Sequence, residues 1–354
     1  MLQHYEHFSR FGWDSNPFTL TVTPELMVGY SEQSKTLLSH VQNFHKFALV
    51  LGPTGAGKTT LLLWLRAQLM ALKDFLPIYV AKPPKKIDDL IFLFKSILRF
   101  NLLDKIRFRN MKIFDLHKFI PSKLRGRRFI LLIDEAHESS IEVLEWLRTL
   151  TDSVPNMSII FAALPVFEND ISTRLPTLFM RFNTKVYLNS LNRSETEALI
   201  AKRIESVGGE GIKPFTEDAV DKIFEITGGF PREIIKVCDF LIKEAASRNM
   251  AVVNKKFIES IYTTPTQPEV VFKLSLPKKQ RQIIELLNET PNLTPSEIVE
   301  HLKFSNYKNK SNAIRSVNNI LRRLMKEELV QRKKLKNSYV YSLTGKAKTI
   351  LAKA

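Results

Sequence analysis

Continuous apolar runs alternate with amphipathic stretches over the first half of the chain. The runs lie at residues 47–51, 75–81, 129–134, 157–164 and 184–188, and stretches with helical spacing separate them. The runs at 47–51 and 129–133 are unbroken, which is typical of a strand buried on both faces of a parallel sheet, because neither of its faces meets water. The pattern predicts an α/β fold with a parallel sheet of about five strands.

Helical patterns without strands follow the predicted sheet. They cover residues 192–207, 216–227 and 231–247, and each repeats apolar residues at a spacing of three or four. We therefore expect a core at residues 1–190, a small helical domain, or lid, at 191–265, and a separate domain at 270–354.

The last 85 residues predict a winged helix-turn-helix. A helical pattern at 278–288 precedes Thr294-Pro-Ser-Glu297, a helix start in which Thr294 caps and Glu297 completes a capping box. A longer amphipathic pattern at 311–327 follows. Residues 329–343 then predict two short strands around a basic turn at 336–338, the hairpin or wing.

The most informative motif is Gly52-Pro-Thr-Gly-Ala-Gly-Lys58-Thr59, placed between an apolar strand and a helical run. Glycines let the backbone curl so that its N–H groups face anionic oxygens, and the following helix N-terminus adds positive charge. Lys58 is expected to reach the β- and γ-phosphates of ATP, and the Thr59 hydroxyl to ligate Mg²⁺. The predicted nucleotide-binding residues are Gly52, Pro53, Thr54, Gly55, Ala56, Gly57, Lys58, Thr59 and Thr60.

A second motif ends the apolar run 129–133 with two acids, Asp134 and Glu135. Open α/β sheets place their ligands at the carboxyl ends of the strands. Asp134 is expected to hold Mg²⁺, directly or through water, and Glu135 to polarise the attacking water. His137 either orients Glu135 or simply belongs to the loop.

Charge is unevenly distributed along the chain. Residues 270–354 hold 18 Lys and Arg against 6 Asp and Glu, a balance of +12 within a total of +17. Solvated helix faces usually mix the two signs, so this bias points to a polyanionic partner, double-stranded DNA.

The candidate DNA contacts fall into two groups. Asn312, Arg315 and Asn319, on the polar face of 311–327, have the donors and acceptors to read base edges. Arg332, Lys333, Lys334 and Lys336, in the wing, offer charge to phosphates. Winged helices also dock proteins, and this alternative stays open.

Cysteine content and hydropathy predict a soluble cytoplasmic protein. The single cysteine, Cys238, excludes a disulfide framework and is expected to be a small buried apolar residue. No apolar run approaches the ~20 residues of a membrane span, so no membrane contact is expected. The histidines show no zinc-ligand spacing.

With these motifs the chain resembles the AAA+ ATPases, in the clade of archaeal origin-recognition initiators, ExeA-like proteins and transposition regulators. Further pieces that support the resemblance are Trp13-Asp-Ser-Asn-Pro-Phe18 and Gly228-Gly-Phe-Pro-Arg232-Glu. The resemblance implies an ATPase with ATP and Mg²⁺ as cofactors, a homo-oligomer, and a role in DNA replication. It also places the segment 26–30 near the adenine.

Two arginine roles are carried over from the resemblance. Arg232 matches the second sensor of the family, which touches the γ-phosphate; the alternative is an arginine at a helix N-terminus that pairs with Glu233 or faces solvent. Arg174 and Arg181 both lie where the family carries an arginine finger that acts on the nucleotide of a neighbouring subunit. We favour Arg181, which is nearer to the fifth strand.

One departure from the family pattern bears on turnover. The family usually has a polar residue near the end of the fourth strand, but this chain has Ala162 and Ala163 there, which predicts slow hydrolysis.

Residues 99–128 form a basic segment for which two roles stay open. They carry ten basic residues against two acids and offer either a DNA contact or a solvated helix face. Its expected apolar stripe is Leu102, Ile106, Ile113, Phe114 and Leu116.

Three functions remain at this point. The first is an initiator-like, nucleotide-switched, DNA-binding ATPase. The others are a loader or assembly ATPase whose winged helix docks a protein, and an ATPase regulator of a mobile element.

Overall fold

The computed structural model describes residues 6–98, 100–108, 111–262, 278–302, 310–326, 329–335, 338–344 and 347. The chain divides into two compact units. The first, called the core from here on, comprises Leu20–Leu191 and Phe230–Arg232. The second comprises Met1–Thr19, Asn192–Gly229 and Glu233–Ala354, and includes the lid and the winged helix.

The core is built on one parallel sheet, as the apolar runs predict. Its strands are β1 (Phe47–Leu51), β2 (Phe75–Val80), β3 (Arg128–Ile133), β4 (Met157–Ala163) and β5 (Phe182–Tyr187). They lie in the order β2-β3-β4-β1-β5, and every neighbouring pair is parallel. The carboxyl ends of all strands therefore meet at one edge, called the carboxyl edge below.

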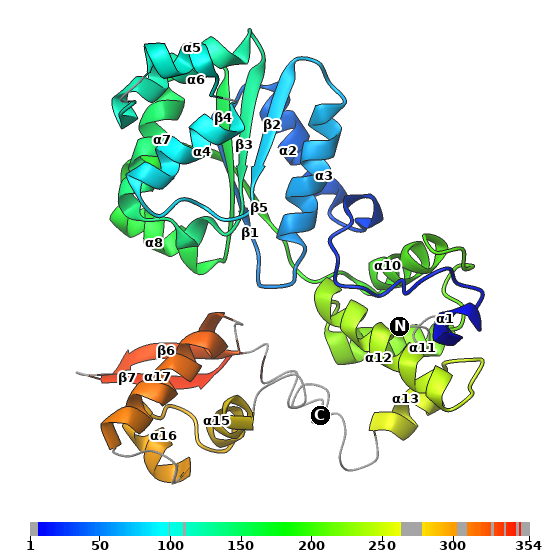
Figure 1. Cartoon of the computed structure of the whole chain (residues 1–354). Helices are drawn as coiled ribbons and strands as arrows, with labels where there is room; N and C mark the ends of the chain where they lie inside the picture. Colours follow the sequence, from blue (N-terminus) through cyan, green and yellow to red (C-terminus); the bar gives the residue numbers. More distant parts are fainter. Residues whose placement is uncertain are drawn as a thin grey trace. The chain divides into compact units, whose positions relative to one another are not determined.

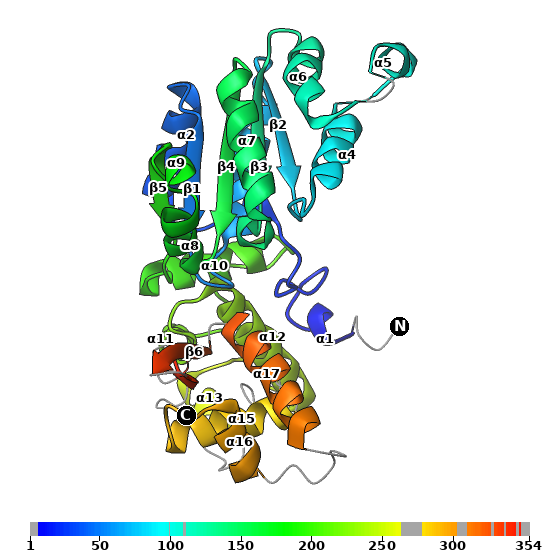
Figure 2. The same ribbon diagram turned by 90° about the vertical axis from the view of Figure 1, so that its left-hand side faces the viewer.

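Helices cover both faces of the sheet (Figures 1 and 2). Helices α2 (Ser31–Gln42) and α3 (Lys58–Met70) lie on one face, and α4 (Ile87–Ile97), α6 (Leu116–Leu124) and α7 (Ile141–Ser153) on the other. Helices α8 (Val166–Arg174) and α9 (Pro176–Phe179) connect β4 to β5. The sheet is thus the middle layer of three, which explains why its inner strands β1, β3 and β4 are buried along their length.

The basic segment after α4 departs from its expected apolar stripe. Ile113 and Leu116 are buried, but Leu102, Ile106 and Phe114 are 68 to 80% exposed. The helix α5 (Leu102–Arg107) turns Asp104 inward instead, because this carboxylate accepts the Asn101 N–H at 2.7 Å and pairs with Lys123. A buried ion pair thus sets the orientation of this short helix, and its aliphatic side chains face outward. Helix α6 follows η3 (Ile113–Asp115).

The lid contains the three predicted helices and a fourth. These are α10 (Arg193–Glu205), α11 (Glu217–Thr227), α12 (Pro231–Ser247) and α13 (Lys255–Tyr262). The N-terminal segment, with α1 (Glu6–Ser9), packs on them. Buried Arg203 donates to the carbonyls of Pro17 and Thr19 at 2.8 and 3.0 Å. In this division the core begins at Leu20, not at residue 1.

The C-terminal domain has the expected winged-helix elements. They are α15 (Lys278–Glu289), α16 (Pro295–Leu302), α17 (Lys310–Lys326), β6 (Val330–Leu335) and β7 (Ser338–Leu343). Strands β6 and β7 pair antiparallel, and Leu293 forms an isolated antiparallel bridge with Tyr341. The predicted turn residue Lys336 lies outside the described residues.

The capping box that starts α16 is confirmed. The Glu297 N–H donates to the Thr294 hydroxyl oxygen at 3.3 Å, and the Thr294 N–H donates to the Glu297 carboxylate at 2.7 Å. The Thr294 N–H, and then the Thr294 hydroxyl, which donates to the same carboxylate at 2.8 Å, lower the pKa of Glu297 because these bonds favour its charged form. The N-terminus of α16 is therefore held by its own sequence.

Candidate functional site

The glycine-rich loop connects β1 to α3 at the carboxyl edge. Gly55 and Gly57 have φ angles of 84° and 95°, a left-handed conformation that side chains disfavour. A Cβ at residue 52 would lie 2.8 Å from the Leu188 carbonyl oxygen, so that position also requires glycine. Gly57 is the N-cap of α3, and Lys58 and Thr59 form its first turn.

Lys58 is held over this loop. Its side chain is almost buried, with the residue 5% exposed, and its ammonium donates to the Gly52 carbonyl at 2.7 Å and the Pro53 carbonyl at 3.1 Å. A buried ammonium fixed at a helix N-terminus is placed to bind phosphate oxygens.

Asp134 follows β3 and meets two hydroxyl groups at the same edge. The Thr59 hydroxyl donates to Asp134 Oδ2 at 2.6 Å, and the Tyr79 hydroxyl donates to the same oxygen at 3.0 Å. Burial, and then the Asp134 charge, raises the pKa of Tyr79 above its usual value, so this hydroxyl stays protonated. Hydroxyl and carboxylate oxygens are the donors that Mg²⁺ prefers, and Thr59 and Asp134 fit that ion.

Glu135 lies beside Asp134 in a different setting. Its backbone is left-handed, with φ at 49°, and its side chain is 41% exposed. His137 Nε2 lies 3.3 Å from Glu135 Oε2. Of the two possibilities for His137, the structure places it against Glu135. The φ value and the exposure leave the carboxylate accessible to a water molecule at the carboxyl edge.

The backbone of Arg232 contacts the glycine-rich loop. Its N–H donates to the Gly55 carbonyl at 3.4 Å, and a Cβ on residue 55 would lie 3.0 Å from the Cβ of Arg232. The expected alternative, a pair with Glu233, is not present among the described contacts, because Glu233 pairs with Lys236 at 3.1 Å. The side chain of Arg232 is exposed.

The carboxyl end of β4 has the predicted apolar character. Ala162 and Ala163 are fully buried, and Ala163 contributes only its carbonyl, which accepts the Gly52 N–H at 3.3 Å. No polar side chain of this strand end is available to a water molecule beside Glu135.

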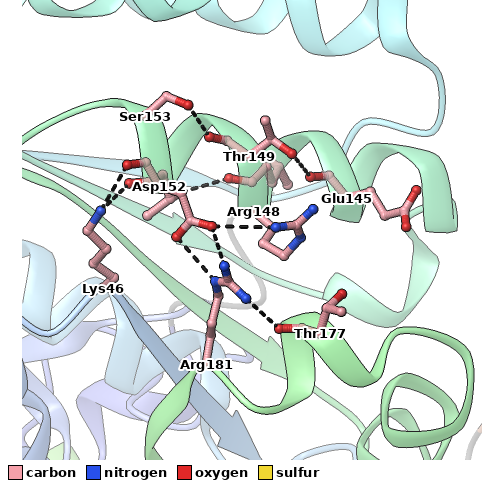
Figure 3. A network of polar contacts seen from close by, with 10 residues as sticks. Lys46, Glu145, Arg148, Thr149, Asp152, Ser153, Thr177 and Arg181 are labelled. Carbon is pink, nitrogen blue, oxygen red and sulfur yellow. Dashed lines mark hydrogen bonds and ion pairs between the residues drawn. The ribbon is translucent and has the colours of Figure 1, made fainter.

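Arg181 is held within its own chain at the amino end of β5 (Figure 3). Its Nη2 lies 2.7 Å from Asp152 Oδ2, its Nε donates to Asp152 Oδ1 at 3.2 Å, and its Nη1 donates to the Thr177 carbonyl at 2.9 Å. Arg148 shares the Asp152 carboxylate. Arg174, at the end of α8, is exposed and forms no hydrogen bond or ion pair within the described part of the chain.

Helix α17 separates an apolar face from a polar one. Val317, Leu321 and Leu324 are fully buried in the small core of the domain. Asn312, Arg315 and Asn319 are exposed on the opposite side, as expected. The side chains of Arg315 and Asn319 form no hydrogen bond or ion pair with any other described residue.

The wing carries exposed positive charge. Arg332, Lys333 and Lys334 in β6 are all exposed, and the Arg332 guanidinium lies 4.6 Å from the centre of the Tyr339 ring. The exposed cations of the wing and of α17 thus belong to one small domain.

Two tyrosines near the loop are absent from the residues that the motifs single out. Tyr79 contacts Asp134, as described. The Tyr30 hydroxyl lies 2.8 Å from the Ala56 carbonyl oxygen and 2.6 Å from that of Asn189. Tyr30 belongs to the segment expected near the adenine. The only sequence signal for Tyr79 is a hydroxyl-bearing side chain near the end of an otherwise apolar strand.

Cys238 is fully buried in α12, and burial raises the pKa of its thiol, as expected for an inert packing residue. Among the described residues, no three His, Cys, Asp or Glu side chains are placed to hold a metal ion.

No helix in the described part of the chain combines the length and the apolar character that a membrane span requires.

The fold and the carboxyl edge have the architecture of an AAA+ P-loop domain, joined to a winged helix. Comparison with known families agrees with this class: residues 42–169 match the model of an AAA domain, and residues 276–354 match that of the penicillinase repressor.

Two curated relatives resemble the chain over part of their length. One is general secretion pathway protein A of Aeromonas hydrophila, 27% identical over 67% of this chain and 44% of its own. The other is an uncharacterised HTH-type transcriptional regulator, MJ0774, of Methanocaldococcus jannaschii, 26% identical over 50% of this chain and 45% of its own. The chain thus spans less than half the length of these relatives.

A solved structure shares the fold over nearly the whole chain. The Aeropyrum pernix ORC1 protein in complex with DNA has a TM-score of 0.57 and 15% identity, with 92% of each chain covered. The findings together confirm the expected resemblance to the AAA+ clade that includes archaeal origin-recognition and ExeA-like proteins, with a C-terminal winged helix.

Proposed function

We propose that the chain binds ATP with Mg²⁺ at the carboxyl edge of its core and binds double-stranded DNA through its winged helix. The single observation that carries the DNA part is the face of α17. Exposed Arg315 and Asn319, without partners among the described residues, lie opposite a closed apolar core, and the exposed cations of β6 belong to the same domain. Donors that no described residue of their domain uses are suited to bases and phosphates.

At the carboxyl edge the proposed roles follow the contacts. Lys58 binds the β- and γ-phosphates, Thr59 and Asp134 hold Mg²⁺, and Glu135 orients the attacking water. Bound Mg²⁺ supplies charge neutralisation for the phosphates. Because Ala162 and Ala163 offer no polar group, Glu135 acts with His137 alone, and hydrolysis is slow. ATP thereby serves as a lasting switch state more than as a fuel.

Arg232 is the proposed sensor of the γ-phosphate. Its backbone contact with Gly55 places its exposed side chain in the immediate surroundings of the loop, and Glu233 does not compete for it. A guanidinium in this position favours the ATP state over the ADP state.

An arginine before β5 is proposed to act on the nucleotide of a second copy. Arg181 must leave Asp152 to do so, whereas Arg174 is already exposed. Arg181→Ala, Arg174→Ala and Asp152→Asn distinguish the two when ATP binding, turnover and thermal unfolding are measured. If the replaced arginine is the finger, the variant loses ATP turnover but keeps ATP binding. If the arginine only holds α7 in place, its replacement destabilises the protein by about the same amount as Asp152→Asn.

Duplex binding across salt concentration, with ATP, with ADP and without nucleotide, tests the DNA part. A DNA-binding protein shows a linear fall of log K with log salt, with about one unit of slope per phosphate contacted. A nucleotide switch changes the affinity between ATP and ADP. Negligible binding to duplex at low salt contradicts the proposal.

The loader and the mobile-element regulator are the alternatives. The relative from Aeromonas hydrophila is named for general secretion, and this name favours a loader or assembly role over DNA reading. The archaeal ORC1 structure contains DNA and the relative MJ0774 is named as a regulator, and both support DNA binding. Recovery and sequencing of bound genomic DNA decides between them, since an initiator concentrates at one replication origin.

A further inference from the structure

Tyr79 occupies a position that the nucleotide-binding motifs do not include. It lies in β2, beside β3, where its register partner is Leu132, two residues before Asp134. Its hydroxyl donates to Oδ2 of Asp134, at the end of the neighbouring strand, at 3.0 Å. A tyrosine on a neighbouring strand therefore contacts the carboxylate proposed to hold Mg²⁺.

Three donors from three segments fix the Asp134 carboxylate. Thr59 in α3 and Tyr79 in β2 both donate to Oδ2, at 2.6 and 3.0 Å, and the Glu135 N–H donates to Oδ1 at 2.9 Å. A carboxylate oxygen has two lone-pair sites in its plane, so the two hydroxyl groups fill those of Oδ2. Oδ1 keeps one site, and the Thr59 oxygen keeps its own lone pairs.

This arrangement decides which oxygens remain for a cation. With Tyr79 present, Asp134 cannot turn Oδ2 away from Thr59 without losing a second hydrogen bond on that oxygen. The carboxylate plane is thus set before any ion arrives. Preset geometry favours Mg²⁺, which demands near-ideal octahedral coordination and gives up its waters reluctantly, over more tolerant divalent ions.

We propose that Tyr79 is a positioning residue that fixes the Asp134 carboxylate for Mg²⁺ and thereby sets the metal preference of the nucleotide site. The inference rests on the proposed Mg²⁺-ATP site. Tyr79 contacts Asp134 and acts through it, without touching the nucleotide.

Tyr79→Phe removes only the hydroxyl and keeps the ring. Affinity for a fluorescent ATP analogue is measured with Mg²⁺, with Mn²⁺ and with EDTA, together with the Mg²⁺ concentration that half-saturates the effect. Tyr79→Phe is expected to raise that Mg²⁺ concentration about tenfold, the lower end of what loss of a ligand-orienting partner costs. The half-saturating Mn²⁺ concentration is expected to rise less, and the affinity for the ATP analogue in EDTA is expected to stay unchanged.

A matched control exists in the same unit. The Tyr187 hydroxyl lies 3.1 Å from both carboxylate oxygens of Glu168 in α8, another pair of a tyrosine and a carboxylate. Tyr187→Phe is expected to bind the analogue like the parent under all three conditions.

The outcomes separate this inference from the proposed function. If the parent binds the analogue with Mg²⁺ and Tyr79→Phe has the same Mg²⁺ dependence, only the inference about Tyr79 is wrong. An equal loss in Mg²⁺, Mn²⁺ and EDTA also overturns it, because that result indicates a role in packing alone. A parent that binds no nucleotide overturns the proposed function and the inference with it.

Discussion

The carboxyl edge of the core and the polar face of α17 both present positive side chains, but they hold them in opposite ways. Lys58 is 5% exposed and donates to two carbonyls of its own loop. The Arg315 side chain is exposed and bonds to no other described residue. The first cation has its position fixed by the fold, whereas the second gains a fixed position only from a partner.

This difference has an energetic consequence. At the carboxyl edge several contacts converge on one small region, so one substitution removes a function that its neighbours cannot replace. On the winged helix each side chain adds a separate, solvent-screened contribution, so the losses are smaller and nearly additive. The following substitutions test this contrast, from the largest expected effect to the smallest.

Lys58→Ala and Glu135→Gln are expected to separate nucleotide binding from turnover. Lys58→Ala removes a buried ammonium and should abolish detectable ATP binding, a loss of about 100-fold or more. Glu135→Gln should bind ATP like the parent and slow hydrolysis by about 100-fold or more, since it removes the base. Titration with an ATP analogue and single-turnover hydrolysis measure the two effects. If Glu135→Gln hydrolyses ATP at the parental rate, the role of Glu135 is wrong.

The core should be more sensitive to acid than the winged helix. His40, in α2, is buried, and its Nδ1 lies 2.9 Å from the Thr184 hydroxyl oxygen. Burial, and then the nearby His45, lowers the pKa of His40 to about 4. Its ordinary pKa is about 6.5, so the unfolded chain takes up the proton first, and stability falls as the pH drops from about 6.5 to about 4. The total loss amounts to about 3 kcal/mol.

Urea unfolding at several pH values, followed by Trp64 and Trp146 fluorescence, measures this loss, because both tryptophans lie in the core. His40→Asn keeps a hydrogen-bonding group near Thr184 but does not titrate, and it should flatten the pH dependence. In the described part of the winged helix, the only histidine, His301, is exposed. An unchanged acid profile in His40→Asn rules out His40 as the cause.

Arg315→Ala tests base reading by α17. It is expected to cost about 1 to 3 kcal/mol on a preferred duplex and little on random sequence. Arg323→Ala, in the carboxyl half of the same exposed helix, serves as the matched control. Competition binding with preferred and random duplexes measures both variants. Equal losses on the two duplexes reduce α17 to a backbone-binding or protein-docking element.

Replacing Lys333 and Lys334 together tests charge in the wing. The double variant is expected to weaken binding to every duplex about equally, by about tenfold, and to lower the salt slope by about two units. Lys35 and Lys213 are exposed lysines outside the winged helix, and they pair with Glu32 and Glu210. Their double replacement changes the net charge by the same amount. A similar change of slope in that control assigns the effect to net charge instead of the wing.

Sequence alone determined the features that depend on neighbouring residues. The loop at Gly52 to Thr59 follows from glycine at left-handed positions, and the start of α16 follows from the Thr294 and Glu297 spacing. The inner strands β1, β3 and β4 follow from apolar runs, because burial on both faces leaves no alternation. The amphipathic spacing of α17 likewise fixed which of its faces is buried.

Only the tertiary structure decided the contacts between segments that are distant in sequence. Strand order places Tyr79 beside Asp134, and the packing of α7 against α9 brings Asp152 to Arg181, which follows α9. The ion pair of Asp104 with Lys123 turned Leu102 and Ile106 outward against the expected stripe. Helical and strand periodicity specify which side of an element is apolar, but the register and the order of the elements specify which side chains meet.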